Sequence, residues 1–261
     1  MMTLLIKLLM MCTIYGCSTE EDDVEPIIID IELHGQQPII AHRGYHHDKN
    51  TPQNSLAAFK EALLLNIYAS ECDVRQTSDG VFVISHDDNF DGLSISRTPY
   101  MELGDHTLSN GEPLPQLEHF LQELKMANSR VKLALDIKDC NINELVALVQ
   151  EYGVLEKVLF IGSHRSVCNQ LRKKGLGGIT FYLTGNMSPT KVKQSRYGGI
   201  DYKDSIYDEH PLWIKEAKTL GLKTIVWTVN DKDAIYSYIR RGVIVTTDKP
   251  MFVEGVKKQE E

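Results

Sequence analysis

The stretch PIIAHRG, residues 38–44, decides the fold, because it shows how a buried strand of this chain ends. Its apolar first half is typical of a strand that is covered on both faces. The stretch then ends in His42, Arg43 and Gly44, an ending that packing alone does not require. If other strands also end in ionisable residues, the carboxyl ends of the strands form a site, as they do in α/β barrels.

Seven further apolar runs follow, and most are separated by amphipathic segments with helical spacing. Several of these segments close with a glycine, which is a signal for the end of a helix. Buried strands that alternate with helices predict a parallel sheet, and eight repeats in about 220 residues fit a closed (β/α)8 TIM barrel with the helices outside. The eight runs span residues 39–41, 69–74, 81–85, 131–137, 158–161, 179–183, 223–229 and 243–246.

Three alternatives to this strand assignment stay open. Only residues 76–80 connect the second and third runs, and Asp79-Gly80 is a tight-turn signal, so a local hairpin competes with a third barrel strand at 81–85. The run Ile200-Asp201-Tyr202 is interpreted as a loop or a minor strand. An open doubly wound sheet would show the same alternation of strands and helices.

The first 36 residues are predicted to lie outside the folded domain, which we place at residues 37–261. Residues 1–16 contain an apolar run that is too short to span a bilayer, as in a secretory signal peptide. The following Cys17 ends the stretch IYGC, which resembles the lipobox of bacterial lipoproteins. The acidic residues 17–36 then form a flexible tether. This pattern predicts secretion across the inner membrane and a lipid anchor at Cys17, on the periplasmic side or the cell surface. A plain signal peptide or an ordinary buried cysteine is the alternative.

The composition is that of a globular protein. Hydrophobic residues make up 42% and charged residues 25% of the chain, which permits a sizeable core. The formal net charge of −8, without a basic block, predicts no nucleic-acid partner, although a small phosphate ligand needs only one or two cations. Cys72, Cys140 and Cys168 lack a regular spacing, so we expect them to pack rather than to form disulfides or a zinc site.

Acidic residues cluster in the second and fourth runs. Glu71 and Asp73 lie two positions apart and therefore point to the same side of a strand, with Cys72 on the other side. Neighbouring carboxylates repel one another unless a cation lies between them, and Asp136 can supply a third oxygen ligand. Such hard ligands predict one divalent cation, Ca²⁺ or Mg²⁺, and a surface salt-bridge network is the alternative. Lys138 repeats the two-residue spacing from Asp136 and adds an ammonium group.

Histidines end the first and third runs. His42 and His86 are imidazoles with an ordinary pKa of about 6.5, which suits proton transfer near neutral pH. Because odd and even strands alternate around the mouth of a barrel, histidines on the first and third strands would flank carboxylates on the second and fourth. The other histidines, His46 among them, are expected to be structural, and Asn230 and Asp248 are expected to hold loops at the mouth.

The ordered set of motifs is more specific than any one of them. It consists of His-Arg-Gly at 42–44, Pro-Gln-Asn-Ser at 52–55, Glu-x-Asp-Val at 71–74, Thr-x-Asp-Gly at 77–80, His-Asp at 86–87, Leu-Asp-Ile-Lys at 135–138, Trp-Thr-Val-Asn at 227–230 and Thr-Asp-x-Pro at 247–250. In this order the motifs resemble the glycerophosphodiester phosphodiesterase family. The resemblance implies a TIM barrel that hydrolyses glycerophosphodiesters to sn-glycerol 3-phosphate and an alcohol.

The resemblance also implies a role for each matching residue. His42 is favoured as the base and His86 as the acid, while the nucleophile is either water or the substrate's own glycerol hydroxyl. Trp227 and Tyr182 either form an apolar wall or belong to the core. The expected roles are cation binding for Glu71, Asp73 and Asp136, proton transfer for His42 and His86, and phosphate or substrate binding for Arg43, Lys138 and Trp227.

Two positions depart from the family pattern, which usually has glutamate at both. Gln53 can still support the site through hydrogen bonds. Asp136 is one methylene shorter than glutamate, so it would bind a cation with lower affinity, through a water molecule, or after a shift of the backbone. The irregular segment 90–115 after His86 is expected to shape substrate choice. Two rival functions stay open: a phospholipase-like phosphodiesterase that acts on intact lipid or inositol head groups, and a non-catalytic binding lipoprotein.

Overall fold

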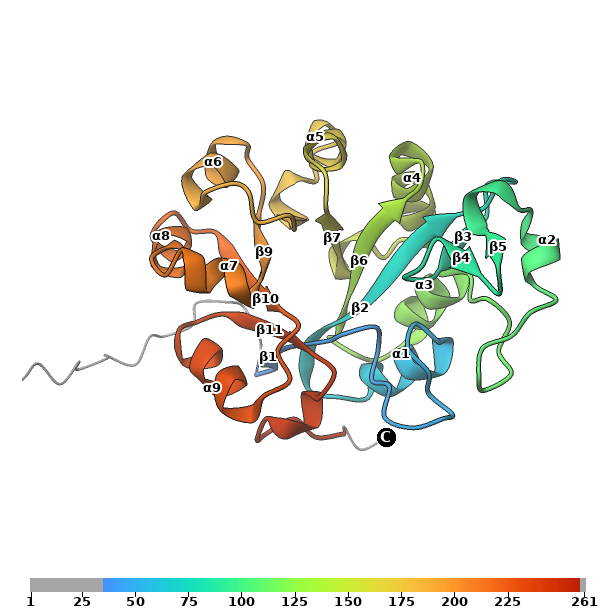
Figure 1. Cartoon of the computed structure of the whole chain (residues 1–261), viewed down its shortest axis with the longest axis horizontal. Coiled ribbons are helices and arrows are strands. Elements are labelled where there is room, and N and C mark those ends of the chain that lie inside the picture. The colour runs from blue at the N-terminus through green and yellow to red at the C-terminus, as the bar shows by residue number, and fades with distance from the viewer. Residues whose placement is uncertain (1–34, 259–261) are drawn as a thin grey trace, which may run out of the picture.

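Eight parallel strands close into a barrel in this computed structural model, which describes residues 35–258. Around the ring, β1 is followed by β11, β10, β9, β8, β7, β6 and β2, and β2 pairs with β1 to close it. Figure 1 shows the helices outside this ring. The strands are β1 (Gln37–Ala41), β2 (Ile67–Gln76), β6 (Lys132–Asp139), β7 (Val158–Gly162), β8 (Thr180–Tyr182), β9 (Gly199–Lys203), β10 (Lys223–Trp227) and β11 (Ile244–Thr247).

Two strand assignments made from the sequence were wrong. The run at 81–85 is not a barrel strand, because β3 (Phe82–Ile84) pairs antiparallel with β2 outside the ring. The physical reason is the short connection: parallel strands need a crossover of about a dozen residues, whereas Asp79-Gly80 makes the tight turn of a hairpin. Residues 200–202, interpreted as a loop or minor strand, belong to β9, which pairs with both β8 and β10. The predicted number of barrel strands was right, although one predicted member, the run at 81–85, is replaced by β9.

The helices follow the predicted amphipathic segments closely. Ser55 caps α1, since its side chain accepts a hydrogen bond from the backbone N–H of Ala58 at 2.9 Å. Gly153 ends α4 in the left-handed conformation at φ +71°. The helices α2 (Tyr100–Leu103) and α7 (Asp204–Glu209) were not predicted. The others are α1 (Leu56–Leu63), α3 (Leu117–Met126), α4 (Ile142–Tyr152), α5 (Arg165–Lys173), α6 (Pro189–Gln194), α8 (Trp213–Thr219) and α9 (Lys232–Arg240).

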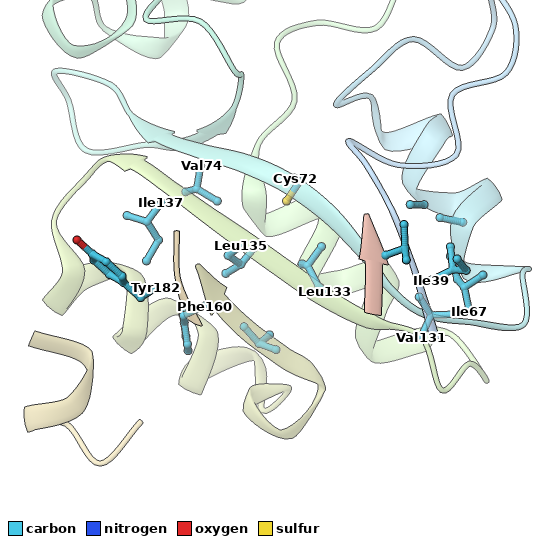
Figure 2. Packing of buried hydrophobic residues seen from close by; sticks show 14 of the residues in the cluster. Ile39, Ile67, Cys72, Val74, Val131, Leu133, Leu135, Ile137, Phe160 and Tyr182 are labelled. Carbon is cyan, nitrogen blue, oxygen red and sulfur yellow. The ribbon is translucent and has the colours of Figure 1, made fainter. Parts of the chain in front are cut away.

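The core has two layers that follow the alternation of side chains along each strand. The outer layer lies between strands and helices and holds Cys72, Leu133 and Leu135, which Figure 2 shows on one side of β2 and β6. A smaller inner cluster fills the barrel, with Ala69 and Ala134 among its members. Because Cys72 points outward, Glu71 and Asp73 point into the barrel, as predicted.

The three cysteines in the described part of the chain are unpaired, as expected. Cys72 and Cys168 are buried in the outer core layer, and Cys140 packs against it. Burial raises the pKa of Cys140 and Cys168 to about 12, so neither is a reactive thiolate near neutral pH.

The irregular segment after β3 forms a small structure of its own. It contains the two-stranded hairpin of β4 (Asn89–Phe90) and β5 (Leu93–Ser94) and the short α2. A separate cluster of Val83, Ile95, Leu103 and Leu114 holds it together. In Figure 1 it projects beside β3, away from the barrel ring.

The signal peptide predicted at 1–16, the lipidated Cys17 and most of the tether predicted at 17–36 lie outside the described residues. Gln36, the last tether residue, is buried, and its side chain donates a hydrogen bond to the carbonyl of Ile67. Within residues 35–258, no helix has both the length and the apolar character needed to cross a membrane.

Candidate active site

All eight residues that the sequence singled out line one pocket at the carboxyl ends of the barrel strands. The pocket encloses about 120 Å³. Its lining residues are His42, Arg43, Glu71, Asp73, His86, Asp136, Lys138, Ile161, Leu183, Asp201, Trp227 and Thr246. The strands β1, β2 and β6 supply most of its ionisable residues, whereas β7 to β10 supply a largely apolar side.

The turn after β1 explains why this strand ends in His-Arg-Gly. Arg43 and Gly44 both adopt positive φ angles, +52° and +84°. A Cβ on Gly44 would lie 2.8 Å from the carbonyl carbon and the Cβ of Ala58 in α1, so no larger residue fits. The turn aims the backbone N–H of Arg43 at Glu71 Oε2, at 2.8 Å. Glycine is therefore required so that a backbone donor can reach the acidic cluster.

The three predicted metal ligands lie together. One oxygen from each of Glu71, Asp73 and Asp136 can be chosen so that all lie within 4.8 Å of one another. Asp73 and Asp136 are direct neighbours in the register of β2 and β6. Lys138 Nζ lies 2.6 Å from Asp136 Oδ2 and 3.0 Å from Asp73 Oδ1, and Arg43 Nε lies 3.2 Å from Asp73 Oδ2.

The electrostatics of this cluster are unbalanced. Burial, and then repulsion by Asp73 and Asp136, raises the pKa of Glu71 well above its usual value. Burial also raises the pKa of Asp136. Burial acts on Asp73 in the same direction, but Lys138, Asn54 and Arg43 outweigh it and hold the pKa of this carboxyl low. Favourable contacts outweigh burial only at Asp73, whereas burial and repulsion prevail at Glu71 and Asp136 despite the contact of Asp136 with Lys138.

These residues fit a divalent cation. The donor set consists of carboxylate oxygens, which Ca²⁺ and Mg²⁺ prefer. Asp136 Oδ1 is buried without a hydrogen-bond partner, so this oxygen is available as a ligand. Three carboxyl groups against the two cations Arg43 and Lys138 leave an excess of acidic groups, which a bound divalent cation would offset.

His42 is anchored by a residue whose role was underestimated. Its Nδ1 lies 2.7 Å from Asp248 Oδ1, and His46 Nε2 lies 3.1 Å from the same oxygen. Asn230 donates to Asp248 Oδ2 at 2.6 Å. The predicted loop support for Asp248 and structural role for His46 leave out these contacts at the site. Since Asp248 occupies Nδ1 of His42, Nε2 is the ring nitrogen left for the pocket.

His86 reaches the pocket from outside the barrel ring. It follows β3, which is not a barrel strand, so the alternation of barrel strands does not explain its position. His86 still lies beside the carboxylates, because β3 pairs with β2. Its Nδ1 lies 2.8 Å from Asp87 Oδ1, and its carbonyl accepts from Arg75 Nη2 at 2.7 Å. The side chain is 45% exposed, which places it at the open edge of the site.

Gln53 and the two aromatic residues are placed as follows. Gln53 Oε1 accepts a hydrogen bond from Arg43 Nη1 at 2.7 Å, which confirms that the amide supports the first-strand site. Trp227 lines the pocket and donates from Nε1 to the carbonyl of Asp201 at 3.1 Å. Tyr182 belongs to the outer core layer and does not line this pocket.

Two residues at the site were not identified from the sequence. Asn54 Nδ2 donates to Asp73 Oδ2 at 2.8 Å, and Asn54 Oδ1 accepts from the backbone of Asp73. Asp201 lines the pocket from β9, and burial followed by repulsion from Asp136 raises its pKa well above the usual value. The sequence contained a signal for Asp201, because side chains alternate between the two faces of a strand. Since Ile200 and Tyr202 face outward, Asp201 between them faces into the barrel.

Replacing Asp248 with asparagine should make the stability of the fold depend less on pH in the acid range. Hydrogen bonds from His42 and then His46 hold the pKa of Asp248 below its usual value. Such a carboxylate stabilises the fold above its unfolded pKa of about 3.9, and the contribution is lost as the pH falls through the folded pKa. Urea midpoints from pH 6 to pH 3 should therefore fall less in Asp248→Asn than in the wild type. Equal losses in the two proteins would contradict this.

Comparison with known proteins identifies the family. The chain is 32% identical to a glycerophosphodiester phosphodiesterase of Parabacteroides distasonis, whose crystal structure superposes with a TM-score of 0.77 over 82% of this chain and 93% of that one. The chain belongs to the glycerophosphodiester phosphodiesterase family. The model of the glycerophosphoryl diester phosphodiesterase family matches residues 42–158, which contain all the predicted site residues except Trp227.

Two further comparisons agree with this assignment. A glycerophosphodiester phosphodiesterase of Caldanaerobacter subterraneus is 26% identical over 84% of this chain and 98% of its own length. A phosphodiesterase of Oleispira antarctica, solved in complex with the product sn-glycerol-3-phosphate, shares the fold with a TM-score of 0.64 at 23% identity, over 81% of this chain and 93% of that one. Similarity to these phosphodiesterases therefore extends over most of the barrel.

Proposed function

We propose that this chain hydrolyses glycerophosphodiesters to sn-glycerol 3-phosphate and an alcohol, with one divalent cation and a pair of histidines. The observation that carries the proposal is the convergence of His42, His86 and three carboxylates on one pocket that also holds Arg43 and Lys138. Family membership supports the reaction type, and the product complex of the related Oleispira antarctica protein supports the product.

Glu71, Asp73 and Asp136 would hold the cation, and their hard oxygens favour Ca²⁺ or Mg²⁺. When bound, the ion supplies positive charge that offsets the negative charge of the phosphoryl oxygens. Arg43 and Lys138 add fixed positive charge at the same pocket. Arg43 offers a planar set of donors that suits phosphate, while Gln53 and Asp73 restrict the rotation of its side chain.

The two histidines divide the proton transfers. Asp248 holds His42 by Nδ1, so its Nε2 takes the proton from the nucleophile. Asp87 holds His86 by Nδ1, so its Nε2 gives a proton to the oxygen of the departing alcohol. The greater exposure of His86 supports this order, because the alcohol must leave toward solvent. The nucleophile is water or the glycerol hydroxyl, and His42 serves either one.

The pocket suits only one half of the substrate. Its volume of about 120 Å³ is well below the roughly 300–1,000 Å³ that encloses a drug-sized ligand. A second, open groove adjoins it at His86 and Lys138 and continues along Asp87, Asp88 and Asn89. We place the glycerol phosphate half in the closed pocket and the alcohol half in the open groove.

A lipid anchor at Cys17 remains part of the proposal. Its support is the stretch IYGC at 14–17 and the acidic residues that follow. Cells that express the full chain should incorporate labelled fatty acid into the protein, and Cys17→Ser should abolish the label. An unlabelled wild-type chain would leave only the plain signal peptide.

The reaction is tested on residues 18–261 with a panel of substrates. Release of glycerol 3-phosphate should be measured from glycerophosphocholine, glycerophosphoethanolamine and glycerophosphoinositol, with added Ca²⁺ or Mg²⁺ and with a chelator. We expect release that requires the cation. Release that persists in the chelator would refute the metal dependence, cleavage of intact phospholipid alone would indicate a phospholipase, and no release would favour a binding lipoprotein.

A further inference from the structure

Asp201 is a buried acid in the pocket that has no assigned role. Its side chain faces the inside of the barrel, the residue is 2% exposed, and Oδ1 is buried without a hydrogen-bond partner. Buried polar atoms in proteins are nearly always paired, because an unpaired one loses its bonds to water and gains nothing in return. A carboxyl oxygen left unpaired at the floor of a pocket therefore indicates a partner that arrives with a ligand.

The position of Asp201 in the ring indicates which part of a ligand it meets. In the order of the strands, β9 lies four strands from β2 in either direction, so Asp201 faces Glu71 and Asp73 across the barrel. Ile161, Leu183 and Trp227 form the neighbouring apolar side of the pocket. A phosphate group placed against Arg43 and Lys138 would leave the opposite side of the pocket, where Asp201 lies, for the carbon chain attached to it.

The backbone of Asp201 is held in place by its surroundings. Strand β9 is paired on both sides, with Asp201 opposite Ile225 of β10, and the carbonyl of Asp201 accepts a hydrogen bond from Trp227 Nε1. A group that is fixed before a ligand binds loses little entropy when it forms a bond. Asp201 is thus positioned for recognition rather than for movement.

We propose that Asp201 binds a hydroxyl group on the glycerol half of the substrate and selects diesters that carry this hydroxyl. The inference rests on the proposed function, because it deepens the choice of substrate at the same pocket. A hydroxyl both donates and accepts hydrogen bonds, so it satisfies a carboxyl in either protonation state. A site built to bind a hydroxyl rejects an analogue that lacks it, because its own polar group then stays unpaired.

A fourth cation ligand is the competing role for this residue. Asp136 is close enough for its charge to act on Asp201, since burial and then repulsion from Asp136 raise the pKa of Asp201. However, the group of oxygens within 4.8 Å of one another comprises Glu71, Asp73 and Asp136 and leaves Asp201 out. The experiment must therefore measure hydroxyl recognition and cation binding separately.

The test compares two ligands that differ only in hydroxyl groups. Dissociation constants are measured by calorimetry, under saturating Ca²⁺ or Mg²⁺, for sn-glycerol 3-phosphate and for propyl phosphate, which lacks both hydroxyls. We expect the wild type to bind glycerol 3-phosphate about 10–100-fold more tightly than propyl phosphate. Asp201→Ala should reduce this ratio to nearly 1, and Asp201→Asn should restore part of it. Asp208→Ala, which removes an exposed carboxyl of α7 outside the pocket, should leave the ratio unchanged.

Two further readouts separate the possible failures. Melting without ligand should show Asp201→Ala at least as stable as the wild type, because an unpaired buried carboxyl is removed; a lower melting temperature would indicate a structural role and overturn the inference. A wild-type ratio retained in Asp201→Ala, or weaker cation binding with the ratio unchanged, would also overturn it. If the wild type cleaves no glycerophosphodiester, the proposed function itself fails.

Discussion

His42→Ala lowers kcat by about 10²–10⁴-fold at saturating substrate and cation, because it removes the imidazole that takes the proton from the nucleophile. The ring lies at the turn after β1, lines the pocket and is fixed by Asp248 at 2.7 Å. The measurement is the steady-state release of glycerol 3-phosphate from glycerophosphocholine. Because the substitution leaves the three carboxylates in place, the dissociation constant of the cation should change little.

His46→Ala is the matched control for this loss. His46 contacts the same oxygen of Asp248, at 3.1 Å, but it does not line the pocket. We expect its kcat to fall far less than that of His42→Ala, because it touches neither the substrate nor the reacting atoms. Equal losses in the two variants would show that Asp248 and its hydrogen bonds matter, rather than the imidazole of His42.

Glu71→Gln should abolish the response of the protein to divalent cations. The substitution removes one of the three carboxylates, and we expect kcat/KM to fall about 10²–10³-fold, since a bound cation contributes several kcal/mol to catalysis. Cation at 100 times its dissociation constant should stabilise the wild type by about 2.7 kcal/mol, and the variant much less. Steady-state kinetics measure the first effect, and melting curves with cation and with chelator measure the second.

The same variant should change the pH dependence of the ion-free protein. The folded pKa of Glu71 is raised, so its contribution to stability is full below the unfolded pKa of about 4.3 and is lost as the pH rises through the folded value. In chelator, the urea midpoint of the wild type should therefore fall from pH 4 toward pH 8, and that of Glu71→Gln should fall less. If the urea midpoints of the wild type and of Glu71→Gln fall equally over this pH range, Glu71 is not the source of the pH dependence.

Much of the fold follows from local patterns in the sequence. Apolar runs and glycine-terminated amphipathic segments identify the barrel strands and most of the helices, because burial on both faces and helix capping are properties of short segments. The exchange of β3 and β9 marks the limit of this approach. An apolar run such as 82–84 has the same appearance in a hairpin and in a barrel, whereas the polar Asp201 breaks the run that defines β9.

The site was predictable to the extent that its residues are ionisable and end a strand. Glu71, Asp73 and Asp136 meet these conditions, and two-residue spacing on a strand places side chains on one face. Asp248 and His46 could not be paired in this way, because 202 positions separate them and only the closure of β11 against β1 brings them together. Asn54 lies in a loop, where neither spacing nor hydropathy indicates the direction of a side chain.

Because β3 lies outside the ring, substitutions in the barrel strands and substitutions in the stretch after β3 have different consequences. Substitutions in β2 or β6 alter barrel pairing and the acidic cluster together, so they are tolerated poorly. The stretch from 87 to 115 has its own small cluster of buried residues and no barrel strand, so it can lengthen, shorten or be exchanged while the closed ring keeps its hydrogen bonds. The proposed contact of this stretch with the alcohol half would let relatives with one hydrolytic apparatus diverge in the alcohol that they accept.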